Sequence, residues 1–459
     1  MSPDLLQQLY QLLGPKGVVT EGIEQRTTDG WGNNDCLASV ILRPTTTQQV
    51  SDIMRLCSAE GQKVVTQGGC TNMTHACDTS RDELVISMER MTVIESVDNS
   101  NRTMTVQSGV PLQHIQERAE SEGLFFALDL GARGSATIGG NIATNAGGNQ
   151  VIRYGMAREQ VLGLEVVLAD GRILSSMNQM LKNNAGYDLK HLFIGSEGTL
   201  GIVTRAVLRL RSRLPVATTA LVATDQFSKM PRLLNHMESA LGGKLGAFET
   251  LWQSYYRIAY GGEQQTSPPL SVDCPFYILL ESTGIDAQQD REQFLAALET
   301  AMEQELICDA VLAESQHQQQ GLWAVRDNIP SLQPYQPIIL FDISLPLSEM
   351  ENYLEEMEAN IREIDSSLFI ATLGHLGDGN LHVAVQLGND QPERRKAVEL
   401  AVYGPLQQRG GSISGEHGIG LEKKPYLHLC RSEVEIQLME QLKKLLDPQC
   451  LLNCGKVIE

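Results

Sequence analysis

The segment GGNIATNAGG, residues 139–148, begins and ends with pairs of glycines, which leave the backbone open to a ligand. Glycine has no Cβ, so successive N–H groups of such a segment can approach a bulky anion. QGGCTN, residues 67–72, offers the same opening. Neither segment has the spacing of a Rossmann nucleotide site or of a P-loop. We expect both to hold a pyrophosphate, and tight turns with close packing are the alternative.

The sequence around these segments alternates short strands with helices. A helix is expected after Thr47, which can cap it, and Gly61 would end it. Two hairpins are expected, one joining residues 93–97 to 103–106 and one joining residues 162–168 to 173–174. We therefore expect an α+β domain over residues 1–213.

A second α+β domain is expected at residues 214–430, where longer helices alternate with strands. The apolar periodicity predicts helices at residues 226–241, 288–305 and 348–364, and strands at 276–281, 338–345, 369–373 and 381–385. A last helix, residues 432–446, ends before Asp447 and Pro448. We expect the segment 431–459 to pack back onto the first domain.

Composition excludes several classes of protein. With 459 residues, 42% of them hydrophobic, the chain should fold into two or three domains. No apolar segment reaches the ~20 residues of a membrane-spanning helix. The net charge of -20 makes nucleic acid an unexpected partner. Nine cysteines without a CxxC pair argue against iron–sulfur ligation and a disulfide framework, and indicate a reducing cytoplasm.

A turn flanked by two histidines, GHLGDGNLH at residues 374–382, lies between apolar segments. Its Gly-Asp-Gly-Asn sequence predicts a hairpin that brings His375 and His382 face to face. Two imidazoles placed in this way can bind one metal ion. A pair of structural histidines is the alternative.

A second polar motif, GEHGIG at residues 415–420, puts a carboxylate beside an imidazole in a glycine-flanked loop. Glu416 could complete a His-His-carboxylate site that keeps open positions. His417 would then serve for proton transfer. A helix-capping turn is the alternative.

These segments, in this order, resemble the FAD-linked D-lactate, glycolate and D-2-hydroxyglutarate dehydrogenase family of vanillyl-alcohol-oxidase-type flavoproteins. The resemblance covers nearly the whole chain. Besides the motifs of His375 and Glu416, the matching segments are IGGN (138–141), TNAGG (144–148), RYG (153–155), GYDL (186–189), GSEGTLG (195–201) and LDP (446–448).

The resemblance implies an α+β fold with a two-subdomain FAD-binding domain, a substrate or cap domain with a metal site, and a C-terminal segment that returns to the FAD domain. The flavin should be bound without a covalent link, because Cys70 is expected to be a structural thiol. The expected cofactor residues are Gln67, Gly68, Gly69, Cys70, Thr71, Asn72, Gly139, Gly140, Asn141, Thr144, Asn145, Gly148, Glu197, Gly198, Gly201, Ile202 and Asn453.

The resemblance also implies the chemistry, which is oxidation of a D-2-hydroxy acid to a 2-oxo acid by hydride transfer from C2 to flavin N5. His417 is expected to be the base, and Arg326, Asn380 and His417 are expected to contact the substrate. The expected metal ligands are His375, His382 and Glu416. Zinc suits these ligands, and manganese or iron is the alternative.

The chain departs from relatives that act on D-2-hydroxyglutarate at two places. Pro330 and Leu340 stand where those relatives have a Thr and a Lys for the distal carboxylate, although Arg326 is present. D-2-hydroxyglutarate is favoured, with D-lactate or another less polar acid as the alternative. Cys454 replaces a usual proline, so its loop is expected to be less rigid.

Two alternatives of other classes stay open, a metalloenzyme without flavin and a non-catalytic FAD-binding subunit. The intact motifs of His417 and Glu416 argue against the second. Reduced flavin would pass its electrons to an electron-transfer flavoprotein or a quinone, since the chain has no ferredoxin-type cysteines. A homodimer is the expected assembly of this chain.

Overall fold

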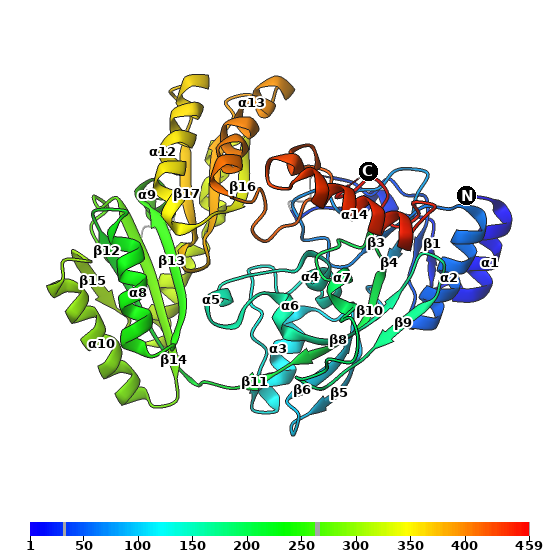
Figure 1. Ribbon diagram of the computed structural model, residues 1–459, viewed down its shortest axis with the longest axis horizontal. Coiled ribbons are helices and arrows are strands. Elements are labelled where there is room, and N and C mark those ends of the chain that lie inside the picture. The colour runs from blue at the N-terminus through cyan, green and yellow to red at the C-terminus, as the bar shows by residue number, and fades with distance from the viewer. Residues whose placement is uncertain (31–33, 262–266, 459) are drawn as a thin grey trace. The chain divides into compact units, whose positions relative to one another are not determined.

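The computed structural model describes residues 1–30, 34–261 and 267–458, which divide into two compact units (Figure 1). The first unit contains residues 1–148, 154–213 and 416–459, and the second contains residues 149–153 and 214–415. The units change after residue 213 and again at Glu416. The domain boundaries predicted from the sequence were after residues 213 and 430. Among the described residues, no helix has the length and apolar character needed to cross a membrane.

The first unit contains a four-stranded sheet of order β1-β2-β4-β3 and a five-stranded sheet of order β5-β6-β10-β8-β9. The five-stranded sheet is antiparallel, and it includes both expected hairpins, β5 with β6 and β8 with β9. The strands of these sheets and of a two-stranded sheet, β11-β7, are β1 (Val18–Val19), β2 (Ile41–Leu42), β3 (Val64–Gln67), β4 (Leu84–Ser87), β5 (Ile94–Asp98), β6 (Thr103–Gln107), β7 (Leu124–Phe125), β8 (Val161–Val167), β9 (Ile173–Ser176), β10 (Ile202–Arg209) and β11 (Arg211–Ser212).

Amphipathic helices cover these sheets. In α2 the spacing of Val50, Ile53 and Cys57 places these side chains on one face, and all three are buried. The N-cap of α2 is Thr46 and not the predicted Thr47, because the Thr46 hydroxyl accepts the N–H of Gln49. The helices are α1 (Pro3–Leu13), α2 (Thr47–Glu60), α3 (Leu112–Ser121), α4 (Ile138–Thr144), α6 (Ala157–Gln160), α7 (Lys190–Phe193) and α14 (Glu433–Leu446), with 3-10 turns η1 (Ile23–Gln25) and η5 (Lys424–Leu429).

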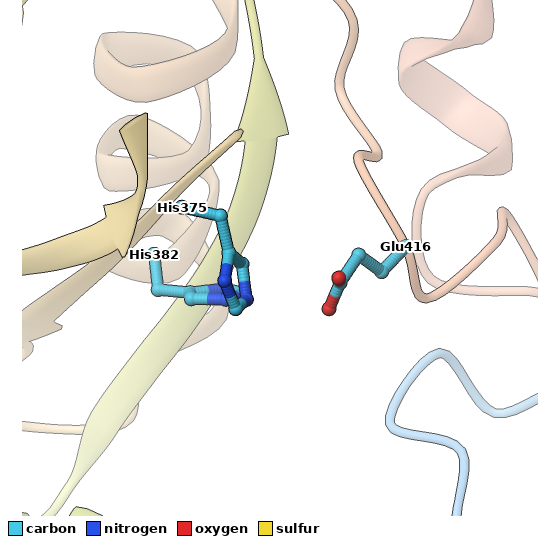
Figure 2. A group of neighbouring side chains, drawn as sticks. All are labelled: His375, His382 and Glu416. Carbon is cyan, nitrogen blue, oxygen red and sulfur yellow. The ribbon is translucent and has the colours of Figure 1, made fainter. Parts of the chain in front are cut away.

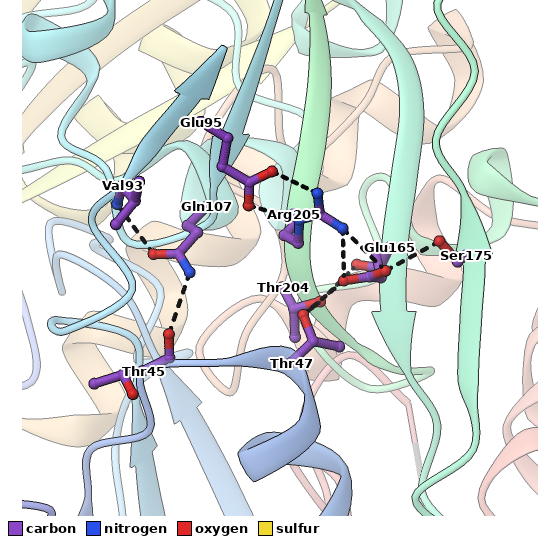
Figure 3. A network of polar contacts seen from close by, with 9 residues as sticks. All are labelled: Thr45, Thr47, Val93, Glu95, Gln107, Glu165, Ser175, Thr204 and Arg205. Atoms are coloured by element: carbon purple, nitrogen blue, oxygen red, sulfur yellow. Dashed lines mark hydrogen bonds and ion pairs between the residues drawn. The ribbon is translucent and has the colours of Figure 1, made fainter.

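A polar network ties α2 to the five-stranded sheet (Figure 3). Arg205 on β10 donates from Nε to Glu95 at 2.7 Å and from Nη1 to Glu165 at 3.3 Å. Glu165 also accepts the hydroxyl of Thr47 at 2.6 Å, so the first residue of α2 is tied to β8. Because the Glu165 side chain is only 10% exposed, this carboxylate depends on its partners to compensate for lost hydration.

Replacing Arg205 by methionine should therefore destabilise the first unit by about 2 kcal/mol, because Glu165 and Glu95 lose their shared cation. The measurement is urea unfolding followed by flavin fluorescence. Arg172→Met is the matched control, since the Arg172 side chain is 76% exposed in its pair with Asp170. Equal midpoints for the two variants would contradict this role of the network.

The C-terminal segment belongs to the first unit, where a buried ion pair holds it. Lys443 on α14 donates from Nζ to Asp447 at 2.6 Å and to the carbonyl oxygen of Thr199 at 2.9 Å. Asp447 in turn accepts the N–H groups of Leu451 and Leu452. These bonds fix the tail beside β3, where Leu452 forms a bridge with Val64.

The second unit is built on one antiparallel seven-stranded sheet of order β15-β12-β14-β13-β17-β18-β16. Its strands are β12 (Val216–Thr224), β13 (Leu245–Trp252), β14 (Phe276–Gly284), β15 (Asp309–Leu312), β16 (Ile338–Ser344), β17 (Ile370–His375) and β18 (Asn380–Gln386). Its helices are α8 (Lys229–Leu241), α9 (Gln253–Gly261), α10 (Ala287–Glu303), α11 (Gln316–Arg326), α12 (Leu347–Ile364) and α13 (Pro392–Tyr403), with 3-10 turns η2 (Ile329–Tyr335), η3 (Leu376–Asp378) and η4 (Gly404–Arg409). Helix α5 (Val151–Tyr154) lies where residues 149–153 join this unit.

The expected hairpin around the two histidines is confirmed. β17 ends at His375, η3 makes the turn, and β18 begins at Asn380. Gly379 allows this turn because its φ is +80°. The hairpin lies inside the sheet between β13 and β16, and this position determines which side chains surround the histidines.

Candidate functional site

The two glycine-rich segments meet in the first unit. Thr137 caps α4 by accepting the N–H of Gly140, and a Cβ on Gly68 would lie 2.4 Å from the Thr137 hydroxyl. A Cβ on Gly139 would lie 2.6 Å from the Cβ of Ser108. A Cβ on Gly68 would also lie 3.7 Å from the backbone nitrogen of Gly140, so residues 67–72 pack against the start of residues 139–148. Side chains at Gly68 and Gly139 have no room.

A cavity with a volume of about 60 Å³ opens between these segments. Two hydroxyl groups in its wall, Thr66 Oγ1 and Ser108 Oγ, are buried without a hydrogen-bond partner among the described residues, which suits a polar ligand. Its wall is formed by Thr66, Gly68, Met88, Ser108, Thr137, Gly139, Gly140, Ala143, Phe193, Glu197, Gly198, Gly201, Ile202, Val203 and Asn453.

Eight of the expected cofactor residues are in this wall, namely Gly68, Gly139, Gly140, Glu197, Gly198, Gly201, Ile202 and Asn453. Outside the wall are Gln67, Gly69, Cys70, Thr71, Asn72, Asn141, Thr144, Asn145 and Gly148. Packing accounts for two of them, because a Cβ would lie 2.1 Å from the Ser135 carbonyl oxygen at Gly69 and 1.9 Å from that of Asp129 at Gly148. Asn145 ends α4 in the left-handed conformation.

The loop that carries His417 is held by two side chains of the first unit. Glu197 accepts the N–H of Ile419 at 2.7 Å and that of Gly420 at 2.9 Å. Burial raises the pKa of Glu197, although these two N–H groups favour its charged form. Asn72 Nδ2 donates to the His417 carbonyl oxygen at 2.6 Å, so the backbone from His417 to Gly420 is fixed.

The second group of interest contains His375, His382 and Glu416 (Figure 2). The two imidazole rings lie 5.3 Å apart between centroids, at an angle of 81°. Glu416 follows Gly415, the last residue of the second unit, and its carboxylate points toward the two rings. The candidate ligand atoms of the three residues lie within 4.8 Å of one another. Two imidazole nitrogens and a carboxylate oxygen are donors that fit zinc.

A buried carboxylate lies behind His375. Glu249 on β13 is 2.7 Å from His375 Nδ1 and accepts Nε of Arg326 at 2.8 Å. Burial alone would raise the pKa of Glu249, but His375 and Arg326 outweigh it and lower this pKa to about 2. The expected substrate residue Arg326 therefore lies beside an expected metal ligand, with its Nη2 2.9 Å from His375 Nε2.

A second buried carboxylate, Asp342 on β16, lies behind Asn380. Asp342 Oδ1 accepts Nδ2 of Asn380 at 2.8 Å, and Oδ2 accepts the N–H of Gly415 at 3.2 Å. The Asn380 Oδ1 atom is buried without a hydrogen-bond partner among the described residues. Because Asn380 and His382 are two residues apart on β18, they share one face of the strand.

The sequence did not identify Glu249 or Asp342 as functional. Each is the single acidic residue of an otherwise mostly apolar strand, LGAFETLW in β13 and IILFDIS in β16. An ionised side chain is rarely buried without partners, so a single acidic residue in an apolar strand is the sequence pattern that indicates a buried, partnered carboxylate.

Comparison with known protein families matches most of the chain to two domain descriptions. Residues 213–457 match the description "FAD linked oxidases, C-terminal domain", and residues 38–176 match "FAD binding domain". These matches and the fold define an FAD-dependent oxidoreductase. The chain belongs to the family of FAD linked oxidases.

Three relatives have the name D-2-hydroxyglutarate dehydrogenase in common. A D-2-hydroxyglutarate dehydrogenase of Stutzerimonas stutzeri is 36% identical over 99% of this chain and 99% of its own. One of Xanthomonas citri is 39% identical over 91% of this chain and 89% of its own. The probable mitochondrial D-2-hydroxyglutarate dehydrogenase of Oryza sativa is 36% identical over 100% of this chain and 82% of its own.

Solved structures confirm the vanillyl-alcohol-oxidase-type α+β fold. p-Cresol methylhydroxylase with substrate bound has a TM-score of 0.79 and 15% identity, and the match covers 99% of this chain and 96% of that one. The 4-ethylphenol oxidase of Gulosibacter chungangensis has a TM-score of 0.74 and 14% identity, and covers 100% and 98%. At these identities the likeness shows the fold.

Proposed function

We propose that this chain oxidises a D-2-hydroxy acid to the 2-oxo acid, with D-2-hydroxyglutarate as the favoured substrate. The observation that carries the proposal is the cluster of His375, His382 and Glu416 with the guanidinium of Arg326 beside it. The names of the relatives support the same substrate class. In a protein of net charge -20, an anionic substrate needs such a local cationic site.

Each group of the proposed site has a separate role in the reaction. FAD, bound without a covalent link by the two glycine-rich segments, supplies the acceptor for the hydride from C2. A divalent ion on the three ligands, with zinc as the best fit, would lower the pKa of the 2-hydroxyl. Arg326 supplies positive charge for the carboxylate, Asn380 presents its buried Oδ1 to the substrate, and His417 takes the hydroxyl proton.

This chain differs from relatives that act on D-2-hydroxyglutarate at the residues expected near the far end of the substrate. Leu340 on β16 packs against the apolar core of the second unit, and Pro330 lies in η2, so neither offers a charge to a distal carboxylate. A less polar acid such as D-lactate is therefore the alternative. Electrons would leave the reduced flavin for an electron-transfer flavoprotein or a quinone. A cytoplasmic location and a homodimeric assembly remain predictions from the sequence.

The test is anaerobic reduction of the bound flavin by matched D- and L-2-hydroxy acids, followed by the loss of the visible flavin absorption. We expect reduction by D-2-hydroxyglutarate, with slower or no reduction by the L-isomer. Faster reduction by D-lactate would move the proposal to the less polar substrate. Absence of reduction by every D-acid, in protein that contains FAD, would contradict the proposed function and favour a non-catalytic subunit.

A further inference from the structure

Two carboxylates face the two histidines across the strands of the second unit. In the sheet order β13-β17-β18-β16, the inner hairpin carries His375 and His382. Glu249 on β13 is the register partner of His375, and Asp342 on β16 is the register partner of His382. Each of the outer strands thus places one buried carboxylate directly opposite one histidine.

Glu249 determines which nitrogen of His375 can bind a ligand. Arg326 Nη2 lies 2.9 Å from His375 Nε2, and a guanidinium can only donate, so Nε2 carries the lone pair, which a bound metal ion would take in place of this N–H. The proton is then on Nδ1, which donates to Glu249 Oε1 at 2.7 Å. The second oxygen of Glu249 accepts Nε of Arg326 at 2.8 Å. One carboxylate therefore orients both the imidazole and the guanidinium.

Asp342 acts differently, because its Oδ1 is 4.0 Å from His382 Nδ1, beyond a direct hydrogen bond. Its two oxygens instead accept Asn380 Nδ2 and the N–H of Gly415. Ser414 Oγ adds a weaker bond at 3.3 Å. Asp342 thus holds the expected substrate amide and the residue that precedes Glu416.

We infer that Glu249 and Asp342 are positioning residues of the proposed site, with separate tasks. Glu249 fixes the Nε2-presenting tautomer of His375 and the orientation of Arg326. Asp342 fixes Asn380 and the segment leading to Glu416. The inference rests on the proposed function for the identity of the bound groups, and on the contacts above for the division of tasks.

The experiment compares Glu249→Gln, Asp342→Asn and the control Asp290→Asn in the full-length, FAD-containing protein. Asp290 is a buried carboxylate of α10 in the same unit, paired with Lys244 at 2.7 Å and away from the histidines. Zinc affinity is measured by competition with a chelating dye, and KM and kcat are measured for D-2-hydroxyglutarate. Bound FAD in each variant reports that it is folded.

For Glu249→Gln we expect zinc affinity to fall by about 10- to 100-fold and KM to rise, because an amide cannot accept from both partners. For Asp342→Asn we expect KM to rise with a change of less than about 10-fold in zinc affinity, since no direct bond to His382 is lost. Asp290→Asn should match the wild type in both. Should Glu249→Gln not fold, Glu249→Asp, too short to reach both partners, is measured in its place.

The positioning role would be overturned if Glu249→Gln bound zinc as tightly as the wild type. It would also be overturned if all three variants lost zinc affinity to the same degree. Failure of the proposed function has a different signature, because wild-type protein would then bind zinc and position Arg326 without reducing its flavin with any D-2-hydroxy acid. In that case the difference in zinc affinity between Glu249→Gln and Asp290→Asn still decides the inference.

Discussion

Replacing His417 by glutamine should lower the rate of flavin reduction by a D-2-hydroxy acid about 10²- to 10⁴-fold, while FAD and zinc remain bound. A proton must leave the 2-hydroxyl as the hydride departs, and glutamine cannot accept it. The loop itself should keep its place, because Asn72 and Glu197 hold it through backbone groups of residues 417, 419 and 420. The measurement is stopped-flow reduction of the flavin under anaerobic conditions.

The matched control is His428→Gln, since His428 is an exposed histidine of η5 in the same C-terminal segment. We expect this variant to reduce its flavin at the wild-type rate. Unchanged reduction in His417→Gln would remove His417 from the chemistry. If the wild type reduced its flavin as slowly as His417→Gln, the better interpretation would be that the chain is a non-catalytic FAD-binding subunit.

The sequence predicted the local parts of the site well, because their signals are local. A turn of Gly-Asp-Gly-Asn between apolar strands can hardly form anything except a hairpin, and its flanking histidines then face each other. The glycine-rich segments are equally direct, since at Gly68 and Gly139 the structure leaves no space for a Cβ. These features depend on neighbours in the chain.

The parts that the sequence did not reveal depend on contacts between distant segments. Strand β13 was not predicted, and Glu249 meets His375 only because β13 and β17 are neighbours in the sheet, 126 residues apart at this pair. Glycine also has two uses that composition cannot separate. Gly140 lies in the cavity wall, whereas Gly148 is required by the close Asp129 carbonyl oxygen and its φ of +129°.

Replacing His382 by glutamine should weaken zinc binding by about 100-fold and lower turnover in parallel. A structural zinc site of four ligands is worth about 10 to 16 kcal/mol, so one ligand contributes roughly 3 kcal/mol, and 1.4 kcal/mol corresponds to a factor of ten. The fold should tolerate the change, because the His382 side chain is 20% exposed at the end of the hairpin. Metal content after dialysis and chelator competition are the measurements.

The decisive comparison is with wild-type protein whose metal has been removed by a chelator. If the ion acts through these three ligands, the stripped wild type and His382→Gln should be slow to the same degree, and added zinc should restore only the wild type. His236→Gln is the control, because His236 lies on α8, bonded to the Ala297 carbonyl oxygen, and should respond like the wild type. Retention of zinc by His382→Gln at wild-type affinity would mean that the paired imidazoles are structural, as the alternative interpretation of this hairpin holds. A stripped enzyme that still turns over would separate metal binding from catalysis, and would leave Arg326 and His417 as the groups that act on the substrate.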